Sequence, residues 1–319
     1  MVGRLYQGLV LAAGAGKRLR PLSLTRSKAL APLCGRPMLA WVLDSLVATG
    51  IADLVVVVAD PDDDVARWCR AWAAGRDLRL RLVVQPERLG MAHALRCAAP
   101  ALVQRFIMHA CDTIVAPGAL AAQLQRHVDA RAACSLCLEH VAGPEHIRKT
   151  AIVTPDGDRI RGIVEKPEPE DAPSDLSAMP IYLFEPEVLA LLPAVRPSAR
   201  GEYEIQDAIS ALIARDRPVH GWLVPERWQI TDCADLLALN FEFLHRGETR
   251  RTAAATCHDP VWVGDDVACG AGCVIGPEAV IESGARLGAG AVVRRAVVLR
   301  EAVVPDGAVV EDCVLAGEG

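Results

Sequence analysis

The chain has 319 residues, a formal net charge of −6 and 52% hydrophobic residues, which is ordinary for a globular protein with one large and one smaller domain. The slight excess of acids argues against a general nucleic-acid binder, which needs a concentrated basic surface. No apolar run approaches the roughly 20 residues that span a bilayer, and the N-terminal segment is too glycine-rich for a signal peptide. We therefore expect a cytoplasmic protein with no nucleic-acid partner and no membrane partner.

The cysteines favour a reducing compartment. There are 11 of them, an odd number, and they are scattered through apolar segments. The single Cys-x-x-Cys pair, Cys134 and Cys137, lies in a strand-like run without a second pair that would complete a zinc site. We expect buried, reduced thiols rather than zinc or redox chemistry.

Short β-rich runs alternate with helical segments from residue 8 to about 245. This alternation predicts an α/β fold with a mostly parallel sheet, and the continuous Val, Ile and Leu runs are typical of strands covered on both faces. Because ligands bind outside the carboxyl ends of such strands, we expect Gly14, Gln85 and Asp112 to meet in one cleft. The predicted strands are 8–14, 54–60, 78–85 and 105–112, and the predicted helices are 37–49, 62–74, 91–101 and 118–130.

Residues 155–230 are less regular. They contain a proline-rich acidic loop at 165–175 and a loop entering a helix at 201–214, and a further amphipathic helix is predicted at 235–246. The polar, small-residue segment that follows resembles a linker. The predicted division is a domain at 1–246, a linker at 247–260 and a second domain at 261–319.

The pattern after residue 260 has a period of six. Counting in sixes gives an apolar residue at every step, and the positions four residues later are all small or apolar. Such a period predicts a short parallel β-helix of about nine six-residue rungs, in which stacked coils bury a shared core. The register decays at Pro305 and Glu311, which suits a terminal cap. The repeating positions are Val263, Cys269, Ile275, Ile281, Leu287, Val293 and Leu299.

The segment after the first strand, LAAGAGKRLRPLSLTRSKAL, predicts a phosphate site. Gly14 and Gly16 leave room for a phosphate chain to approach the backbone N–H groups, and Arg18 and Lys28 add positive charge. The segment lacks the Gly-Lys-Ser/Thr of a Walker loop and the third glycine of a dinucleotide fingerprint. A glycine turn alone is often merely structural, whereas two basic residues beside it indicate phosphate binding.

Three further positions carry chemistry. Asp112 ends a strand, where its carboxylate suits magnesium bound to substrate phosphates, although it could instead cap the next helix. Gln85 offers a donor and an acceptor to a nucleobase edge, with Gly90 letting the base lie against the backbone. Glu165 and Lys166 could grip a sugar-like substrate or form a solvated surface pair.

Together these pieces resemble the sugar-1-phosphate nucleotidylyltransferases, the family of glucose-1-phosphate thymidylyl- and uridylyltransferases. The motifs LAAGAGKRLRPL, QPERLGMAHAL, HACDT, IVEKP and GEYEIQD follow the order and spacing of that family over about residues 8–245. The resemblance implies a Rossmann-like nucleotidyltransferase domain followed by a short left-handed parallel β-helix of hexapeptide repeats. We expect a homo-oligomer, with the β-helix packing subunits together or covering the catalytic domain.

The resemblance also implies a reaction and its residues. A sugar-1-phosphate or cyclitol phosphate would attack the α-phosphorus of UTP or dTTP in line, with Mg²⁺, and release pyrophosphate. The implied catalytic residues are Arg18, Lys28 and Lys166, and the sugar would contact Glu165, Lys166, Ala151 and Met179. The implied nucleotide-binding residues are Leu11, Ala12, Ala13, Gly14, Gly16, Lys17, Gln85 and Gly90.

The second magnesium ligand departs from the family pattern. The family has an aspartate in a Trp-x-Asp-x-Gly segment, and the corresponding position in RWQITDCADLL is Gln229 or Ile230, depending on the anchor. The nearest carboxylate is Asp232. Three readings follow: Asp232 joins Asp112 as a ligand after a loop shift, Gln229 acts as a weaker neutral ligand, or metal binding is impaired.

The sugar side departs from the family too, and two other functions compete. Thr150-Ala151 replaces a Tyr-Gly pair, and Ala178-Met179-Pro180 replaces Asn-Ala-Gly. A non-catalytic regulatory or assembly subunit is the alternative, but it has no physical need for Arg18, Lys28, Asp112 and Lys166 together. Acyl transfer on the β-helix is disfavoured because the segment from residue 257 on holds a single histidine, before the first rung.

Overall fold

The computed structural model describes residues 2–14, 16–20 and 22–317. By packing, the chain forms two compact units. The first, the sheet unit, comprises Met1–Gly14 and Val42–Arg227, and the second, the β-helix unit, comprises Ala15–Trp41 and Trp228–Gly319. The packing thus groups the segment after the first strand with the C-terminal part of the chain. The division at residues 246 and 260 stays a prediction.

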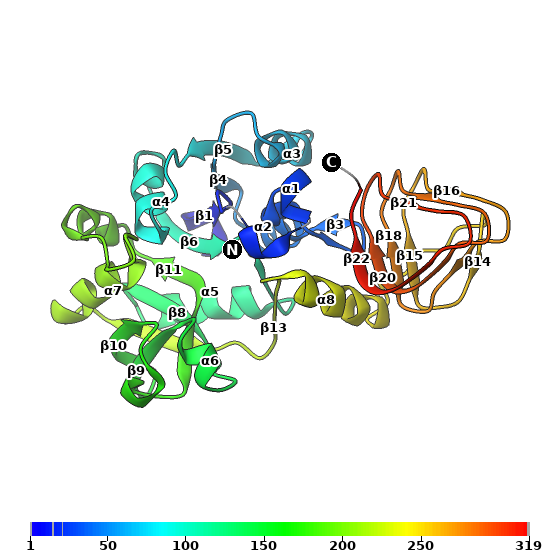
Figure 1. The fold of residues 1–319 in the computed structure, drawn as a ribbon. Coiled ribbons are helices and arrows are strands. Elements are labelled where there is room, and N and C mark those ends of the chain that lie inside the picture. The colour runs from blue at the N-terminus through cyan, green and yellow to red at the C-terminus, as the bar shows by residue number, and fades with distance from the viewer. Residues whose placement is uncertain (1, 15, 21, 318–319) are drawn as a thin grey trace. The chain divides into compact units, whose positions relative to one another are not determined.

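The sheet unit is built on nine strands in the order β5-β4-β1-β6-β11-β8-β12-β10-β9 (Figure 1). The predicted alternation of strands and helices supplies β1, β4, β5 and β6, and residues 134–223 supply the other five strands. Their bounds are Tyr6–Leu11 (β1), Asp53–Val58 (β4), Arg79–Val84 (β5), Arg105–Ala110 (β6), Cys134–His140 (β8), Ala151–Asp156 (β9), Arg159–Glu165 (β10), Leu176–Phe184 (β11) and Val219–Leu223 (β12). Two short strands, Thr113–Val115 (β7) and Arg227–Gln229 (β13), lie outside this sheet.

The first four strands along the sheet pair in parallel, which confirms the α/β prediction. β1 pairs with β4 and β6, and β4 pairs with β5, all in parallel register. β1 and β4 are buried almost throughout because each has a neighbour on both sides, whereas the edge strand β5 carries half-exposed residues. The second half adds antiparallel pairs, since β11 runs against both β6 and β8, and β9 and β10 form a hairpin. The sheet as a whole is therefore mixed.

Helices cover the sheet and supply its core. Ala92 and Leu95 of α4 and Ile205 and Ile209 of α7 pack into one hydrophobic cluster with Phe106 of the central strand β6. The helices are Leu22–Thr25 (α1), Met38–Ala48 (α2), Asp64–Ala73 (α3), Met91–Ala98 (α4), Ala119–Asp129 (α5), Pro144–Ile147 (α6), Ile205–Ala214 (α7) and Cys233–His245 (α8). The 3-10 turns are Val2–Leu5 (η1), Lys17–Leu19 (η2), Lys28–Leu30 (η3), Ala99–Ala101 (η4), Pro169–Asp171 (η5), Pro186–Ala190 (η6) and Leu192–Ala194 (η7).

A buried histidine in β6 predicts a pH-dependent stability. His109 is 0% exposed, and burial lowers its pKa from 6.5 to about 4. The unfolded chain takes up this proton from about pH 6.5 downward while the folded chain does not, so stability falls as the pH falls from 6.5 towards 4, by about 3 kcal/mol at most. We expect the variant His109→Gln to lose less stability than the wild type between pH 7 and 4.5 in urea unfolding. Equal losses in the two proteins would contradict this origin.

The β-helix unit contains nine short strands whose parallel pairs repeat along the chain (Figure 1). Val261 pairs with Ala279, Cys269 with Leu287 and Ile275 with Val293, so partners are 18 residues apart. One coil is therefore three turns of the six-residue period, and the predicted parallel β-helix is confirmed. The strands are Thr256–Cys257 (β14), Val261–Val263 (β15), Ala268–Cys269 (β16), Val274–Ile275 (β17), Ala279–Ile281 (β18), Arg286–Leu287 (β19), Val292–Val298 (β20), Val303–Val304 (β21) and Val309–Leu315 (β22), with a separate hairpin of Pro32–Leu33 (β2) and Arg36–Pro37 (β3).

The six-residue count slips twice, at Arg294–Arg295 and again at Glu311–Asp312, and the coil continues where the strict count predicted a terminal cap. Ala279 pairs with Ala296, which is only 17 residues on, because the turn at Arg294 and Arg295 is one residue shorter than the matching turn in the previous coil. After the first slip, Val298 and Val304 point into the core, whereas the strict count of six predicts Leu299 and Pro305. The coil continues through β22, and at the other end β14 already pairs within the segment predicted as a linker.

No helix in the part of the chain that the structure describes is long and apolar enough to cross a membrane.

Cys134 and Cys137 lie in the interior strand β8, 0% and 1% exposed. Burial raises the pKa of Cys137 to about 12 and that of Cys134 as well, so neither thiol readily ionises to the thiolate that binds metals or attacks disulfides.

Candidate functional site

The carboxyl ends of the parallel strands place several predicted residues at one edge of the sheet unit. The Cys111 N–H donates to the Leu11 carbonyl at 3.3 Å, which sets Asp112 beside the end of β1. The Ala12 N–H donates to the Val57 carbonyl at 2.8 Å, and the Gln85 N–H donates to the Val58 carbonyl at 2.9 Å. The backbone ladder therefore brings Gln85 and Asp112 to the same edge as Leu11 and Ala12, and the meeting of Gly14 with them in one cleft stays a prediction.

Asp112 lies between two strands, so the alternative that it caps a helix is wrong. It follows β6 and directly precedes β7, and α5 begins only at Ala119. The carboxylate is half-buried and accepts a hydrogen bond from the Thr113 hydroxyl at 3.3 Å. The described residues contain no group of three or more His, Cys, Asp or Glu side chains that could hold a metal by themselves. One carboxylate fits magnesium that takes its other ligands from phosphates and water.

Gln85 and Gly90 are held together, but their contacts are with the protein. Gln85 is 6% exposed, and its amide donates to the Gly90 carbonyl at 3.2 Å. Gly90 has φ 96°, and a Cβ there would lie 2.7 Å from the Tyr203 carbonyl oxygen. Glycine is therefore required for the backbone to pass close to Tyr203. Arg88 in the same loop donates to the Ala13 carbonyl at 2.7 Å and ties the loop to the end of β1.

The predicted sugar residues converge on neighbouring strands. Ala151 of β9 pairs with both Glu165 of β10 and Ala178 of β11, and Met179 follows directly in β11. The Lys166 N–H donates to the Thr150 carbonyl at 3.0 Å, and Lys166 adopts φ 49° at the end of β10. Ala151 and Met179 are buried, at 3% and 1% exposure. The structure thus gathers all four predicted residues.

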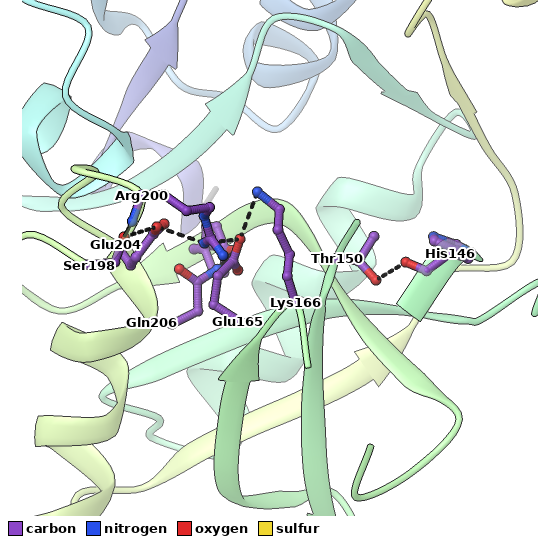
Figure 2. A network of polar contacts seen from close by, with 9 residues as sticks. His146, Thr150, Glu165, Lys166, Ser198, Arg200, Glu204 and Gln206 are labelled. Carbon is purple, nitrogen blue, oxygen red and sulfur yellow. Dashed lines mark hydrogen bonds and ion pairs between the residues drawn. The ribbon is translucent and has the colours of Figure 1, made fainter. Parts of the chain in front are cut away.

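Glu165 belongs to a cluster of two cations, Lys166 and Arg200, and two carboxylates, Glu165 and Glu204 (Figure 2). Lys166 Nζ lies 3.2 Å from Glu165 Oε1, and Arg200 lies 3.4 Å from the same oxygen. Arg200 also pairs with Glu204 at 2.8 Å, and the Ser198 hydroxyl donates to Glu204 at 3.0 Å. Burial raises the pKa of Glu165, while Lys166 favours its ionised form. An incoming anion would find two cations already held in place here.

Sequence reasoning missed Arg200, Ser198 and Glu204. The GEYEIQD motif predicts a loop entering a helix, and Arg200 directly precedes it. Glu204 is the N-cap residue of α7, and Arg200 lies in the loop before it, where the four-residue spacing of a helix surface does not apply. The loop conformation that turns Arg200 towards Glu165 has no simple sequence signature.

In the β-helix unit, Gly16 packs against Lys28. Gly16 has φ 58°, and a Cβ there would lie 2.7 Å from Lys28 Cβ, so only glycine lets the two approach. Lys28 begins η3, and Arg18 lies exposed in η2. The side chain of Lys17 lies outside the described part of the chain. The predicted phosphate-binding residues Gly16 and Lys28 therefore touch each other within one unit.

Asp232 has a structural use at the start of α8. Its carboxylate accepts the Ala234 and Asp235 N–H groups at 2.9 Å and 3.0 Å, and the Asp235 carboxylate accepts the Asp232 N–H at 3.4 Å in return. This reciprocal capping box accounts for Asp232 without a metal. Its assignment as the second magnesium ligand stays a prediction. Gln229, the other candidate, is the last residue of β13.

Comparison with known proteins identifies the family. Residues 7–231 match the family model described as nucleotidyl transferase. The glucose-1-phosphate thymidylyltransferase of Streptomyces griseus is 33% identical over 76% of this chain and 68% of that protein. The UTP–glucose-1-phosphate uridylyltransferase AglF of Haloferax volcanii is 34% identical over 67% of this chain and 86% of that protein. The chain therefore belongs to the sugar-1-phosphate nucleotidylyltransferase family of nucleotidyl transferases.

Solved structures agree on the fold. A UDP-glucose pyrophosphorylase in complex with UDP-glucose matches 76% of this chain and 99% of that chain, with a TM-score of 0.67 and 19% identity. The ligand-free form of a UDP-glucose pyrophosphorylase matches 76% of this chain and 99% of that chain, with a TM-score of 0.68 and 18% identity. At such identities the likeness concerns the fold.

Proposed function

We propose that the protein transfers a nucleotidyl group from UTP or dTTP to a sugar-1-phosphate or a related cyclitol phosphate and releases pyrophosphate. The observation that carries this proposal is the cluster of Lys166, Arg200 and Glu165, which offers two fixed cations beside a carboxylate within a family of nucleotidyl transferases. Cations of this kind suit a phosphate group, and a carboxylate suits sugar hydroxyls.

The proposed chemistry rests on positioning and charge neutralisation. An oxygen of the sugar phosphate attacks the α-phosphorus in line. The bond from the α-phosphorus to the oxygen that bridges the α- and β-phosphates breaks, and this oxygen leaves as part of pyrophosphate. Lys166 and Arg200 hold the attacking phosphate, and Glu165 accepts hydrogen bonds from the sugar. Lys28 stabilises the charge that develops on the α-phosphate, and Arg18 holds the departing pyrophosphate. Such fixed charges lower the barrier because they need no rearrangement during the reaction.

On the nucleotide side, the proposal assigns residues 11–14, Gly16 and Gln85 to binding of the triphosphate and base. Asp112 would hold a magnesium ion, which when bound would neutralise phosphate oxygens. The half-buried carboxylate at the strand end, oriented by Thr113, is the support for that assignment. Glycine at position 16 lets Lys28 lie against the phosphate-binding turn.

The test is a panel of triphosphates and sugar-1-phosphates with Mg²⁺, read as pyrophosphate release. We expect release with at least one pairing that contains UTP or dTTP. The substitutions on the sugar side, with Ala151 buried at 3% exposure where the family has glycine, lead us to include cyclitol phosphates in the panel. No release from any pairing, by protein that still binds a nucleotide, would contradict the proposal.

We also predict the preferred base. Gln85 follows β5 directly and its amide is bonded to the Gly90 carbonyl; a base that displaces this contact would meet a donor and an acceptor, which suit the imide edge of uracil or thymine. UTP or dTTP should therefore raise the melting temperature more than GTP, CTP or ATP at equal concentrations, because a ligand stabilises the fold in proportion to its affinity. Thermal-shift measurements with the five nucleotides check this. A larger shift with GTP alone would overturn the base assignment.

A second function, a non-catalytic regulatory or assembly subunit, is favoured by one observation. Asp232 is engaged in capping α8, and the other candidate for the second metal ligand, Gln229, carries no charge. Such a subunit would bind nucleotide without turnover, and Asp112→Asn would leave its partner binding unchanged. The same substitution should abolish most turnover if the protein is an enzyme.

A further inference from the structure

The strongest unexplained feature is a buried ion pair within the β-helix unit. Arg26 donates to both carboxylate oxygens of Glu282, at 2.8 Å and 2.9 Å, and the two side chains are 18% and 6% exposed. Glu282 follows the last residue of β18, in the β-helix, whereas Arg26 lies two residues before Lys28. The pair therefore joins the C-terminal β-helix directly to the segment that carries the predicted phosphate-binding residues, residues 16–20 and 22–31, called the phosphate segment below.

Glu282 is held rigidly from the β-helix side. Its backbone N–H donates to the Val298 carbonyl at 2.8 Å, as part of the ladder between coils. Its carboxylate also accepts the Arg300 N–H at 2.9 Å, so the side chain is fixed before Arg26 is considered. Among the residues the structure describes, Glu282 is one of only two acids that are buried, at 5% exposure. A buried carboxylate needs such partners, because an unpaired charge in the interior is strongly unfavourable.

From Arg26 the contacts continue to the predicted reacting groups. The backbone carbonyl of Ser27 accepts the Leu30 N–H at 2.9 Å, and that of Lys28 accepts the Ala31 N–H at 3.0 Å. Arg26 therefore directly precedes a short hydrogen-bonded turn. Gly16 then packs on the stem of Lys28. Both bonds come from one guanidinium nitrogen, Nη1, and such charge-assisted bonds are short and strong enough to fix the place of the Arg26 side chain. Loss of the pair would free the residues on which the position of the Lys28 ammonium depends.

We propose that Glu282 is a positioning residue: through its ion pair with Arg26 the β-helix holds the phosphate segment, and with it Lys28, in the geometry needed for nucleotidyl transfer. This inference rests on the proposed function for the role of Lys28. It gives the β-helix a part in catalysis within each chain, beyond assembly or covering. A misplacement of about 1 Å in a catalytic group can cost about 10²-fold in rate.

The test compares Glu282→Gln with a matched control. Glutamine keeps an acceptor for the Arg300 N–H but removes the charge that holds Arg26. The control, Glu311→Gln, removes the same charge from the same β-helix, at an exposed pair with Arg294 whose side chains are 38% and 48% exposed. We expect Glu282→Gln to lower kcat about 10²-fold, with KM for the nucleotide changed less, and Glu311→Gln to stay within about twofold of wild type.

Further variants separate positioning from stability. Arg26→Lys keeps the charge but not the planar guanidinium, so it should retain an intermediate kcat. The double variant Arg26→Gln with Glu282→Gln should cost no more than Glu282→Gln alone, because both act through one pair. A lowered melting temperature with unchanged kcat would mean a purely structural pair and would overturn the proposal. If Glu282→Gln does not fold, the ratio of kcat to KM in Arg26→Lys decides the question.

Hydrogen exchange tests the inference without turnover. We expect the amides of residues 28–31 to exchange about 10-fold faster in Glu282→Gln than in wild type, and at the wild-type rate in Glu311→Gln. Equal exchange in all three proteins would overturn the inference. A wild type with no activity on any substrate pair would remove the proposed function, and the exchange result would still decide whether Glu282 orders the phosphate segment.

Discussion

Replacing Lys166 with methionine should lower kcat/KM about 10²- to 10³-fold, because the change removes a fixed cation from the proposed site of the attacking phosphate. Lys166 lies 3.2 Å from Glu165 and is held at φ 49° at the end of β10, so its ammonium is well oriented. Methionine keeps the length of the stem and removes only the charge. Initial rates at varied sugar-1-phosphate concentrations measure the effect.

The same variant should shift the pH profile. Burial already raises the pKa of Glu165, and Lys166 opposes that rise. Without Lys166 the carboxyl should titrate at a still higher pH, so activity should fall at a higher pH on the acid side than in wild type. Lys149→Met is the matched control, since Lys149 is an exposed lysine in the turn between α6 and β9. Equal losses in the two variants, or an unmoved acid limb, would contradict the role of Lys166.

Asp112→Asn should lower kcat/KM about 10³-fold and raise the Mg²⁺ concentration needed for half-maximal rate. Asparagine has the same shape and still accepts a hydrogen bond from the Thr113 hydroxyl, so the fold should be kept. What it loses is the negative charge that binds a divalent cation beside the phosphates. Rates at a series of Mg²⁺ concentrations, with a saturating triphosphate, measure both changes.

The exposed Asp77 provides the control for this charge change, as Asp77→Asn. It should leave both the rate and the Mg²⁺ requirement unchanged. If Asp112→Asn turns over at the wild-type rate, Asp112 is not the magnesium ligand. If the wild type releases no pyrophosphate from any substrate pair but binds a partner protein, the non-catalytic alternative holds.

The regular parts of the fold were predictable because residues close together in the sequence determine them. Buried strands such as β1 and β4 are runs of apolar residues, and the six-residue period reports the inward positions of the β-helix. The slip at Arg294 and Arg295 was not predictable, since a turn one residue shorter leaves the apolar pattern readable in either register for several residues. Only the pairing of Ala279 with Ala296 resolves it.

The candidate site was predictable where chemistry and strand ends coincide. Asp112 and Gln85 follow strands directly, and the ladder places them at one edge. The role of Arg200 was not predictable, because it depends on the path of a loop. The pair Arg26–Glu282 was not predictable either, because its residues lie 256 positions apart in the sequence. Asp232 was misleading for the opposite reason: a carboxylate near an expected ligand position serves the start of α8 instead.

The central claim is that a nucleotidyl group moves to a phosphate oxygen of a sugar-1-phosphate or cyclitol phosphate, and following a label tests it most directly. UTP or dTTP labelled at the α-phosphorus is incubated with a sugar-1-phosphate and Mg²⁺, and the products are separated. We predict that the label appears in a nucleoside diphosphate sugar while unlabelled pyrophosphate forms in equal amount. Label in a nucleoside monophosphate, or no conversion with any sugar-1-phosphate or cyclitol phosphate, would contradict the claim.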